Sequence, residues 1–161
     1  MRLRSLTCIA AVAIISIVPS AAPAESSETW RQEANRVCRQ LSIALAPAYD
    51  TYFTYLSRGP EEAGRHAAQV ELLNTVSRRS MAANARLARV DPPVTVAKRY
   101  AKVVRLDRLV NGRLPLRLAA LLRERPNSAV RMKVAYLLKR AARLDRRFRR
   151  IAVGLGLSRC G

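Results

Sequence analysis

The sequence predicts an all-α fold: an up-down bundle of about four helices closed by one disulfide. Apolar residues recur at spacings of three and four along most of the chain, whereas the alternation typical of strands is nearly absent. Pro- and Gly-containing breaks divide the chain into segments of helix length. A pair of cysteines near the two ends of the remaining chain can close such a bundle.

The first 24 residues have the pattern of a secretory signal peptide. Arg2 and Arg4 precede an apolar run over 6–18, and 22–24 is a small-x-small cleavage site. The run is shorter than the roughly 20 residues of a membrane span, although an uncleaved anchor is the alternative. Cys8 is expected to leave with the signal. Residues 25–161 are then expected to form a single helical domain.

The first helix is expected to begin near Thr29, which with Gln32 has the spacing of a capping box. Pro47 lacks a backbone donor, so a kink or break is expected there. The apolar seam of this helix has alternating spacings of four and three: Trp30, Ala34, Val37, Leu41, Ala44 and Ala48.

The second helix is expected to start near Pro60 and to end before the Pro-Pro pair at 92–93. The third follows, and Asn111-Gly112 is expected to stop it. The second helix has a seam at Leu73, Val76, Ser80, Ala83, Leu87 and Val90, and the third has a broad apolar face at Val96, Ala97, Tyr100, Ala101, Val103 and Val104.

The segment 114–124 is ambiguous, because Pro115 can open a short separate helix and thereby raise the helix count to five. Pro126 and Asn127 are expected to separate it from the last helix. Gly154 is expected to end that helix as its C′ residue. The last helix has the most regular seam of the chain: Val130, Val134, Leu137, Ala141, Leu144, Phe148, Ile151 and Leu155.

Cys38 and Cys160 are the cysteines outside the signal. An exported protein folds in an oxidising compartment, where an even pair of cysteines indicates a disulfide. We expect this bridge to tie the C-terminal tail to the first helix. Two free thiols or an intermolecular pair are the alternatives.

The charge is divided unevenly along the chain. Residues 25–75 carry seven acids and five bases, whereas 76–161 carry four acids and twenty-three bases. A strongly basic half favours anionic partners such as acidic lipids, phosphate polymers or nucleic acid. The alternative is that these bases are ordinary solvated helix faces, which a GC-rich genome encodes with arginine.

Three segments resemble a group of small exported helical-bundle proteins from high-GC actinobacteria: "RVCRQL" (36–41), "RLARVDPPVTVAKRY" (86–100) and "IAVGLGLSRCG" (151–161). That group has Val/Ile-Cys in its first helix, a Pro-Pro helix break and a terminal Gly-Leu-x-x-Cys. The resemblance implies a Cys38–Cys160 bridge and an extracytoplasmic location, and it implies no activity. The chain departs from the group in its tyrosine cluster and in the leucine-rich piece around Leu118.

The sequence contains no recognisable catalytic or cofactor motif. His66 is the single histidine and has no second histidine with which to hold a metal, so we predict no metal site and no cofactor. No Gly-x-Ser-x-Gly elbow accompanies it. Asp107 and Asp145 are isolated acids among arginines and are expected to form salt bridges. We therefore expect no catalysis, although a pocket with convergent polar groups would favour an enzyme.

Two features remain as candidate binding sites. The first is a basic surface whose arginine forks suit phosphate and carboxylate oxygens: Lys98, Lys102, Arg105, Lys139, Arg143, Arg146, Arg147 and Arg150. The second lies in "AYDTYFTYL", where a bundle end-cap and a protein-partner patch are the two interpretations: Tyr49, Tyr52, Tyr55 and Leu56.

The sequence thus predicts an extracytoplasmic protein, either secreted or associated with the cell envelope. It is expected to bind an anionic envelope polymer or lipid surface through its C-terminal half. A helical adapter that contacts a protein through the tyrosine patch is the alternative. Few aromatic residues accompany the bases, so no specific nucleic acid is expected. No transmembrane helix is expected after the signal, and the oligomeric state is undetermined.

Overall fold

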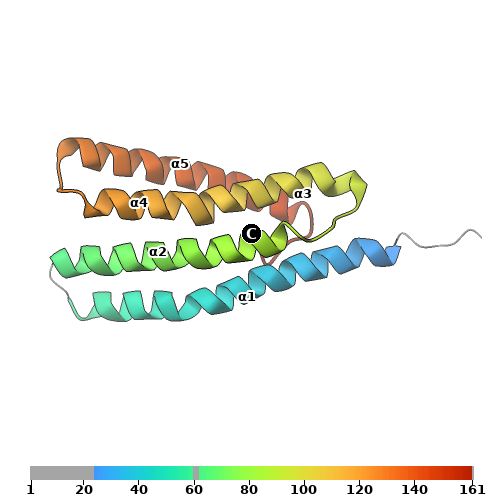
Figure 1. Cartoon of the computed structure of the whole chain (residues 1–161), viewed down its shortest axis with the longest axis horizontal. Helices are drawn as coiled ribbons and strands as arrows, with labels where there is room; N and C mark the ends of the chain where they lie inside the picture. The colour runs from blue at the N-terminus through green and yellow to red at the C-terminus, as the bar shows by residue number, and fades with distance from the viewer. Residues whose placement is uncertain (1–23, 60–61, 161) are drawn as a thin grey trace, which may run out of the picture.

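The computed structural model describes residues 24–59 and 62–160, and within them it shows an antiparallel bundle of four helical rods (Figure 1). Successive rods run in opposite directions, so the predicted up-down bundle is confirmed. The rods are α1 (Ala24–Ser57), α2 (Glu62–Leu87), the continuous series α3 (Val94–Asp107), η1 (Arg108–Arg113) and α4 (Leu114–Arg123), and α5 (Ser128–Val153).

The predicted helix stop at Asn111-Gly112 was wrong, because the third rod continues through it. The segment 114–124 is therefore part of this rod and not a separate one. The backbone passes through η1 as a π-helix, in which the Leu114 N–H donates to the carbonyl of Leu109. A π turn suits this position because Pro115, which follows it, has no N–H to continue the α-helical ladder. Gly112 is buried against α2, where an added Cβ would lie 3.0 Å from Cγ of Met81. Its role is close helix packing rather than chain reversal.

The first rod also runs further than predicted. It begins at Ala24, so Thr29 lies inside the helix and does not cap it. A kink or a break was expected at Pro47. The helix continues through Pro47, so there is no break, and the rod bends along its length (Figure 1). Pro47 lies on the exposed side, where water can bond the carbonyl of Ile43 that lacks its usual partner. The hydroxyl of Thr51 donates to the Pro47 carbonyl at 2.7 Å.

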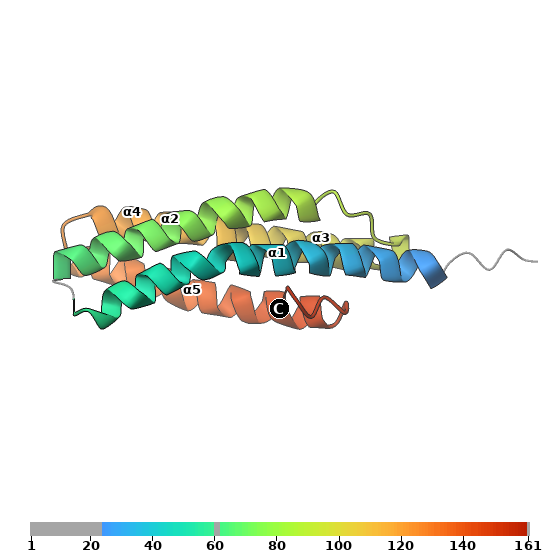
Figure 2. The same ribbon diagram turned by 90° about the horizontal axis from the view of Figure 1, so that it is seen from below.

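Most residues of the predicted seams lie in the core or are partly buried, whereas Ala101 of the predicted third-helix face is exposed. Figures 1 and 2 show that α2 lies between α1 and the third rod, and α5 packs against α3 and α4. The larger core cluster unites α1, α2, α3 and α5 with the tail, and the smaller cluster joins α4 to α5. The larger cluster contains Trp30, Ala34, Val37, Cys38, Ala83, Leu87, Val90, Tyr100, Val103, Leu106, Phe148, Ala152, Leu155 and Leu157, and the smaller contains Leu114, Leu118 and Leu137.

The C-terminal tail is part of this core. The left-handed residue that ends α5 is Gly156, with φ of 77°, and not Gly154, whose φ of −66° is helical. The Leu157 N–H donates back to the carbonyl of Ala152 at 2.9 Å, as in a Schellman motif. This reversal turns the completely buried Leu157 into the core. Helix α5 thus ends at Val153, next to Gly154 as predicted, but the left-handed glycine is Gly156, two residues later than predicted.

The predicted disulfide joins the tail to α1. Cys38 and Cys160 are bonded, with their Cα atoms 5.1 Å apart and a sequence separation of 122. Two further contacts support the tail: Nε of Arg31 donates to the Leu155 carbonyl at 3.0 Å, and Nδ2 of Asn35 donates to the Gly156 carbonyl at 3.1 Å. The end of the chain is thus fixed to the first helix.

The predicted signal peptide, residues 1–24, lies outside the described residues except for Ala24, and so does Cys8. No helix in the described part of the chain combines the length and the apolar character that a membrane crossing requires.

Candidate functional site

The basic surface covers the outer faces of α3, α4 and α5. Between Lys98 and Arg159 the sequence holds nineteen lysines and arginines, and all of them except the half-buried Arg140 are exposed. All eight residues proposed for this surface are among the exposed ones. They lie on α3 and α5, which are packed side by side, so the fold joins two sets of bases that are about forty residues apart in sequence.

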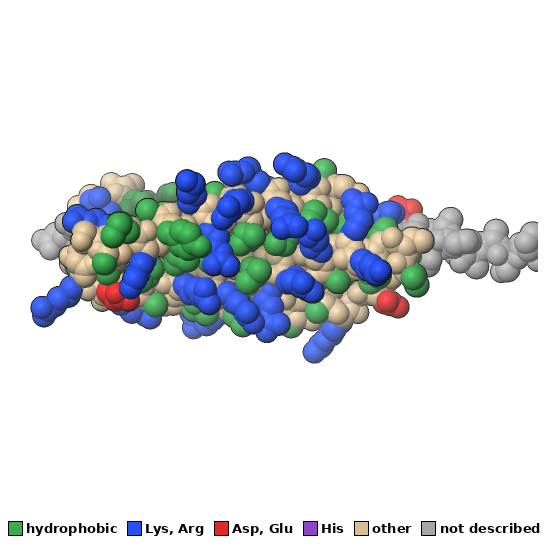
Figure 3. Space-filling view, turned by 90° about the horizontal axis from the view of Figure 1, so that it is seen from above, with side chains coloured by type: hydrophobic (Ala, Val, Ile, Leu, Met, Phe, Trp, Pro, Cys, Tyr) green, Lys and Arg blue, Asp and Glu red, His purple; other side chains and the backbone are tan. Residues whose placement is uncertain are grey.

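Acidic side chains do little to neutralise this surface. The same part of the chain contains three acids: Asp107, Glu124 and Asp145. Asp107 is buried, and Asp145 pairs with Arg149 at 2.8 Å. The expected salt bridge of Asp145 is thereby confirmed. Figure 3 shows one face of the molecule with lysine and arginine side chains along its whole length and acidic side chains only towards its ends. The arrangement creates a broad positive surface and not an enclosed site for one anion.

The outward stripe of α5 includes two apolar residues that the sequence reasoning did not assign to it. Lys139, Arg143, Arg146 and Arg150 continue, at spacings of four and three, a line that begins with Met132 and Tyr136. Met132 is 68 % exposed and Tyr136 is 59 % exposed. Helical spacing alone would have placed both residues on this stripe. They were not predicted because they lie outside the apolar seam and carry no charge.

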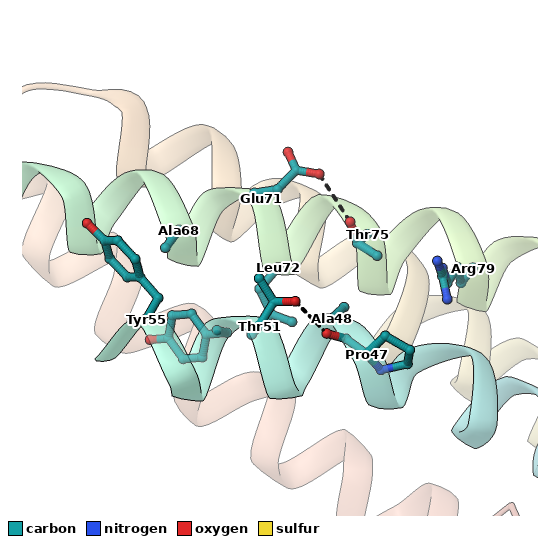
Figure 4. A pocket seen from close by; sticks show the side chains of 10 residues that line it. Pro47, Ala48, Thr51, Tyr55, Ala68, Glu71, Leu72, Thr75 and Arg79 are labelled. Atoms are coloured by element: carbon teal, nitrogen blue, oxygen red, sulfur yellow. Dashed lines mark hydrogen bonds between the residues drawn. The ribbon is translucent and has the colours of Figure 1, made fainter. Parts of the chain in front are cut away.

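The tyrosine segment is divided between two surroundings. Tyr52 and Tyr55 are half-buried and, together with Leu72 of α2, line a cavity of about 400 Å³ between α1 and α2 (Figure 4). The Tyr55 hydroxyl points toward α2 and rests on Gly64, whose missing side chain leaves room for it. Tyr49 instead stacks on the exposed Phe53, with ring centroids 6.5 Å apart. Leu56 is half-buried.

A second, partly open cavity of about 330 Å³ is lined by both cysteines of the disulfide and by residues of all four rods. Leu41 and Leu45 of α1 form apolar walls, Ser80, Asp107 and Asn111 supply polar groups, and Arg149 is also part of the lining. The hydroxyl of Ser80 is buried and has no hydrogen-bond partner among the described residues. This polar cavity was not predicted, because its residues come from all four rods and the tail, which are far apart in sequence.

Asp107 is held by two amides instead of an arginine, so its predicted salt bridge was wrong. Nδ2 of Asn84 donates to one carboxylate oxygen and Nδ2 of Asn111 donates to the other, each at 2.8 Å. Burial raises the pKa of the Asp107 carboxyl, and the two amide hydrogen bonds act in the opposite direction. Asn84 also donates to the Val104 carbonyl at 2.7 Å. The network links α2 to α3 and η1 and holds Asp107 in place.

His66 lies half-buried beside a cavity of about 350 Å³ that α4, α5 and their connection also line. Within the part of the chain that the structure describes, no three His, Cys, Asp or Glu side chains come together in an arrangement that could hold a metal ion.

Comparison of the chain with protein-family models, with curated proteins and with solved structures found no match. The resemblance to exported actinobacterial proteins therefore stays a prediction.

Proposed function

We propose that this protein is an exported, non-catalytic binding protein that attaches to anionic cell-envelope material through the basic surface of α3, α4 and α5. The observation that carries the proposal is that eighteen of the nineteen bases between Lys98 and Arg159 are exposed and have hardly any acidic neighbours. A field of this kind raises the local concentration of anions. Arginine forks then pair with phosphate or carboxylate oxygens.

The disulfide supports the exported part of the proposal. Such bonds persist in oxidising compartments outside the cytoplasm, and Cys38–Cys160 closes a core that includes the tail. An extracytoplasmic protein with a basic face meets the lipid headgroups and polymers of the envelope, whose phosphates and carboxylates carry negative charge.

The test compares binding of the oxidised chain from Glu25 onward to acidic vesicles, to neutral vesicles and to soluble inorganic polyphosphate over a salt series. We expect binding to both acidic probes that weakens steeply as salt rises, and little binding to neutral vesicles. The absence of binding to both acidic probes at physiological salt would overturn the proposal.

A matched pair of variants locates the site. The charge reversal R143E/R146E/R150E should lower the affinity for both acidic probes by more than about tenfold, because each base near an anionic surface contributes about 1 kcal/mol. The control R36E/R39E/R89E changes the net charge equally through three exposed arginines of α1 and the α2–α3 connection. Its effect should be much smaller at physiological salt, since distant charges are screened beyond about 8 Å. Equal losses would show that only net charge matters.

A further inference from the structure

The outer face of α4 and α5 carries exposed apolar side chains among its bases. Met132, Tyr136 and Leu116 are 68 %, 59 % and 42 % exposed. Near them, an apolar groove of about 330 Å³ lies between α4 and α5 and is open to solvent. Its lining consists of Arg117, Ala120, Leu121, Lys133, Tyr136 and Leu137. On the face of the molecule that Figure 3 shows, hydrophobic side chains (green) are scattered between lysines and arginines (blue).

Two cations line an otherwise apolar groove. Arg117 comes from α4 and Lys133 from α5, and both side chains are exposed. Long basic side chains lay their methylene stems along apolar surface and keep their charged ends in a polar layer. An apolar floor with cations beside it is complementary to an acidic lipid, whose acyl chains lie beneath a layer of phosphates.

The stripe of α5 extends this complementarity along the helix. From Met132 to Arg150 it spans about 27 Å at 1.5 Å per residue, with apolar residues at its start and Lys139, Arg143, Arg146 and Arg150 after them. A soluble polyanion would be held by the bases alone and would leave Met132 and Tyr136 in water. A bilayer interface can bury both while its headgroups meet the bases.

We propose that the partner of the basic surface is an acidic phospholipid bilayer, into whose interface Met132 and Tyr136 insert beside the α4–α5 groove. The inference rests on the proposed function, and it names the lipid surface in place of a wall polymer. Helix α5 then lies along the membrane surface, with its stripe towards the headgroups and its seam in the bundle.

The test uses a matched pair of apolar variants of the oxidised chain from Glu25 onward. M132S/Y136S removes the two inserted side chains, and I43S/F53S removes two side chains of α1 that are 63 % and 61 % exposed. The probes are vesicles of phosphatidylglycerol with phosphatidylcholine, and soluble inorganic polyphosphate. All four substituted residues are exposed, so both variants should fold, which circular dichroism verifies.

We expect M132S/Y136S to lower the affinity for acidic vesicles roughly tenfold, since partial burial of two such side chains accounts for that factor. Its affinity for polyphosphate should stay unchanged, and I43S/F53S should bind both probes as the wild type does. Vesicle binding by M132S/Y136S at wild-type strength, or an equal loss in I43S/F53S, would overturn the lipid assignment. If wild type binds neither probe, the proposed function itself fails.

A second measurement observes insertion directly. In Y136W, bilayers with brominated acyl chains should quench the added tryptophan, whereas in F53W they should not, and the native Trp30 is buried in the core of both variants. Absence of quenching in a vesicle-bound Y136W would also overturn insertion and would leave a purely electrostatic contact.

Discussion

The two ends of the bundle are built differently. At the disulfide end, which contains Trp30, Tyr100 and the Cys38–Cys160 bridge, four elements and the tail share one core. At the open end, which contains the last turns of α1 and the α4–α5 connection, the core cluster includes no residue of α1. There, cavities of about 400 Å³ and 350 Å³ lie between the helices. Aromatic contacts differ likewise: Trp30 packs edge-on against Tyr100 in the core, whereas Phe53 is 61 % exposed.

The difference shows what the tail does for the fold. The backbone of α1 comes close to that of α2 and, among the described helices, to no other. At the disulfide end, Leu155 and Leu157 occupy the space between α1 and α5. The tail does not reach the open end, where the backbone of α1 comes close only to that of α2 among the described helices. Stability should therefore be concentrated at the disulfide end.

The largest effect is expected when the bridge is removed. The variant C38S/C160S should lower the free energy of unfolding by about 5 kcal/mol in the chain-entropy model, because the bond closes a loop of 122 residues. Chemical denaturation of oxidised wild type and variant measures it. A loss under about 1 kcal/mol would mean that the buried tail holds the two helices together without the bond.

The next test compares one apolar side chain from each end. Leu157→Ala empties a completely buried site in the core and should cost about 2 to 5 kcal/mol. Phe53→Ala should stay within about 0.5 kcal/mol because the ring is largely exposed. Equal losses in urea denaturation would contradict the proposed contrast between the ends.

A smaller effect concerns the contact between α1 and α2 at the open end. Gly64→Ala places a Cβ against the Tyr55 hydroxyl and should destabilise by about 1 kcal/mol. In a Tyr55→Phe background the hydroxyl is gone, and the same change should stabilise by up to about 1 kcal/mol through helix propensity. A double-mutant cycle measures the reversal, and additive effects would show that the two residues do not touch.

The smallest effect is the pH dependence that Asp107 produces. Its pKa in the fold is raised, chiefly by burial, above the value of about 3.9 in the unfolded chain. Between these two values the folded chain binds more protons, so the contribution of Asp107 to stability falls as pH rises. The stability advantage of wild type over Asp107→Asn should be largest below pH of about 4 and should decline above it. Denaturation of both proteins across a pH series measures this advantage, and an increase with pH would contradict the raised pKa.

The sequence by itself determined the helical class, the seams and the pairing of the cysteines. Periodicity records which side of a helix faces apolar surroundings, and that information is local. The seam of α5 is an example, because Val130, Leu137 and Phe148 are buried as their spacing requires. Eight exposed bases were likewise found from spacing, since charged residues seldom lie in a core.

Only the tertiary structure decided where helices end and which polar groups meet. Asn111-Gly112 resembles a stop signal, but the contact of Gly112 with α2 and the π turn before Pro115 carry the helix through it. Asp107 was expected to meet an arginine and instead bonds to Asn84, which is 23 residues away on another helix. The apolar groove beside Tyr136 exists only because α4 lies beside α5. These outcomes depend on contacts between distant segments, which local propensity does not encode.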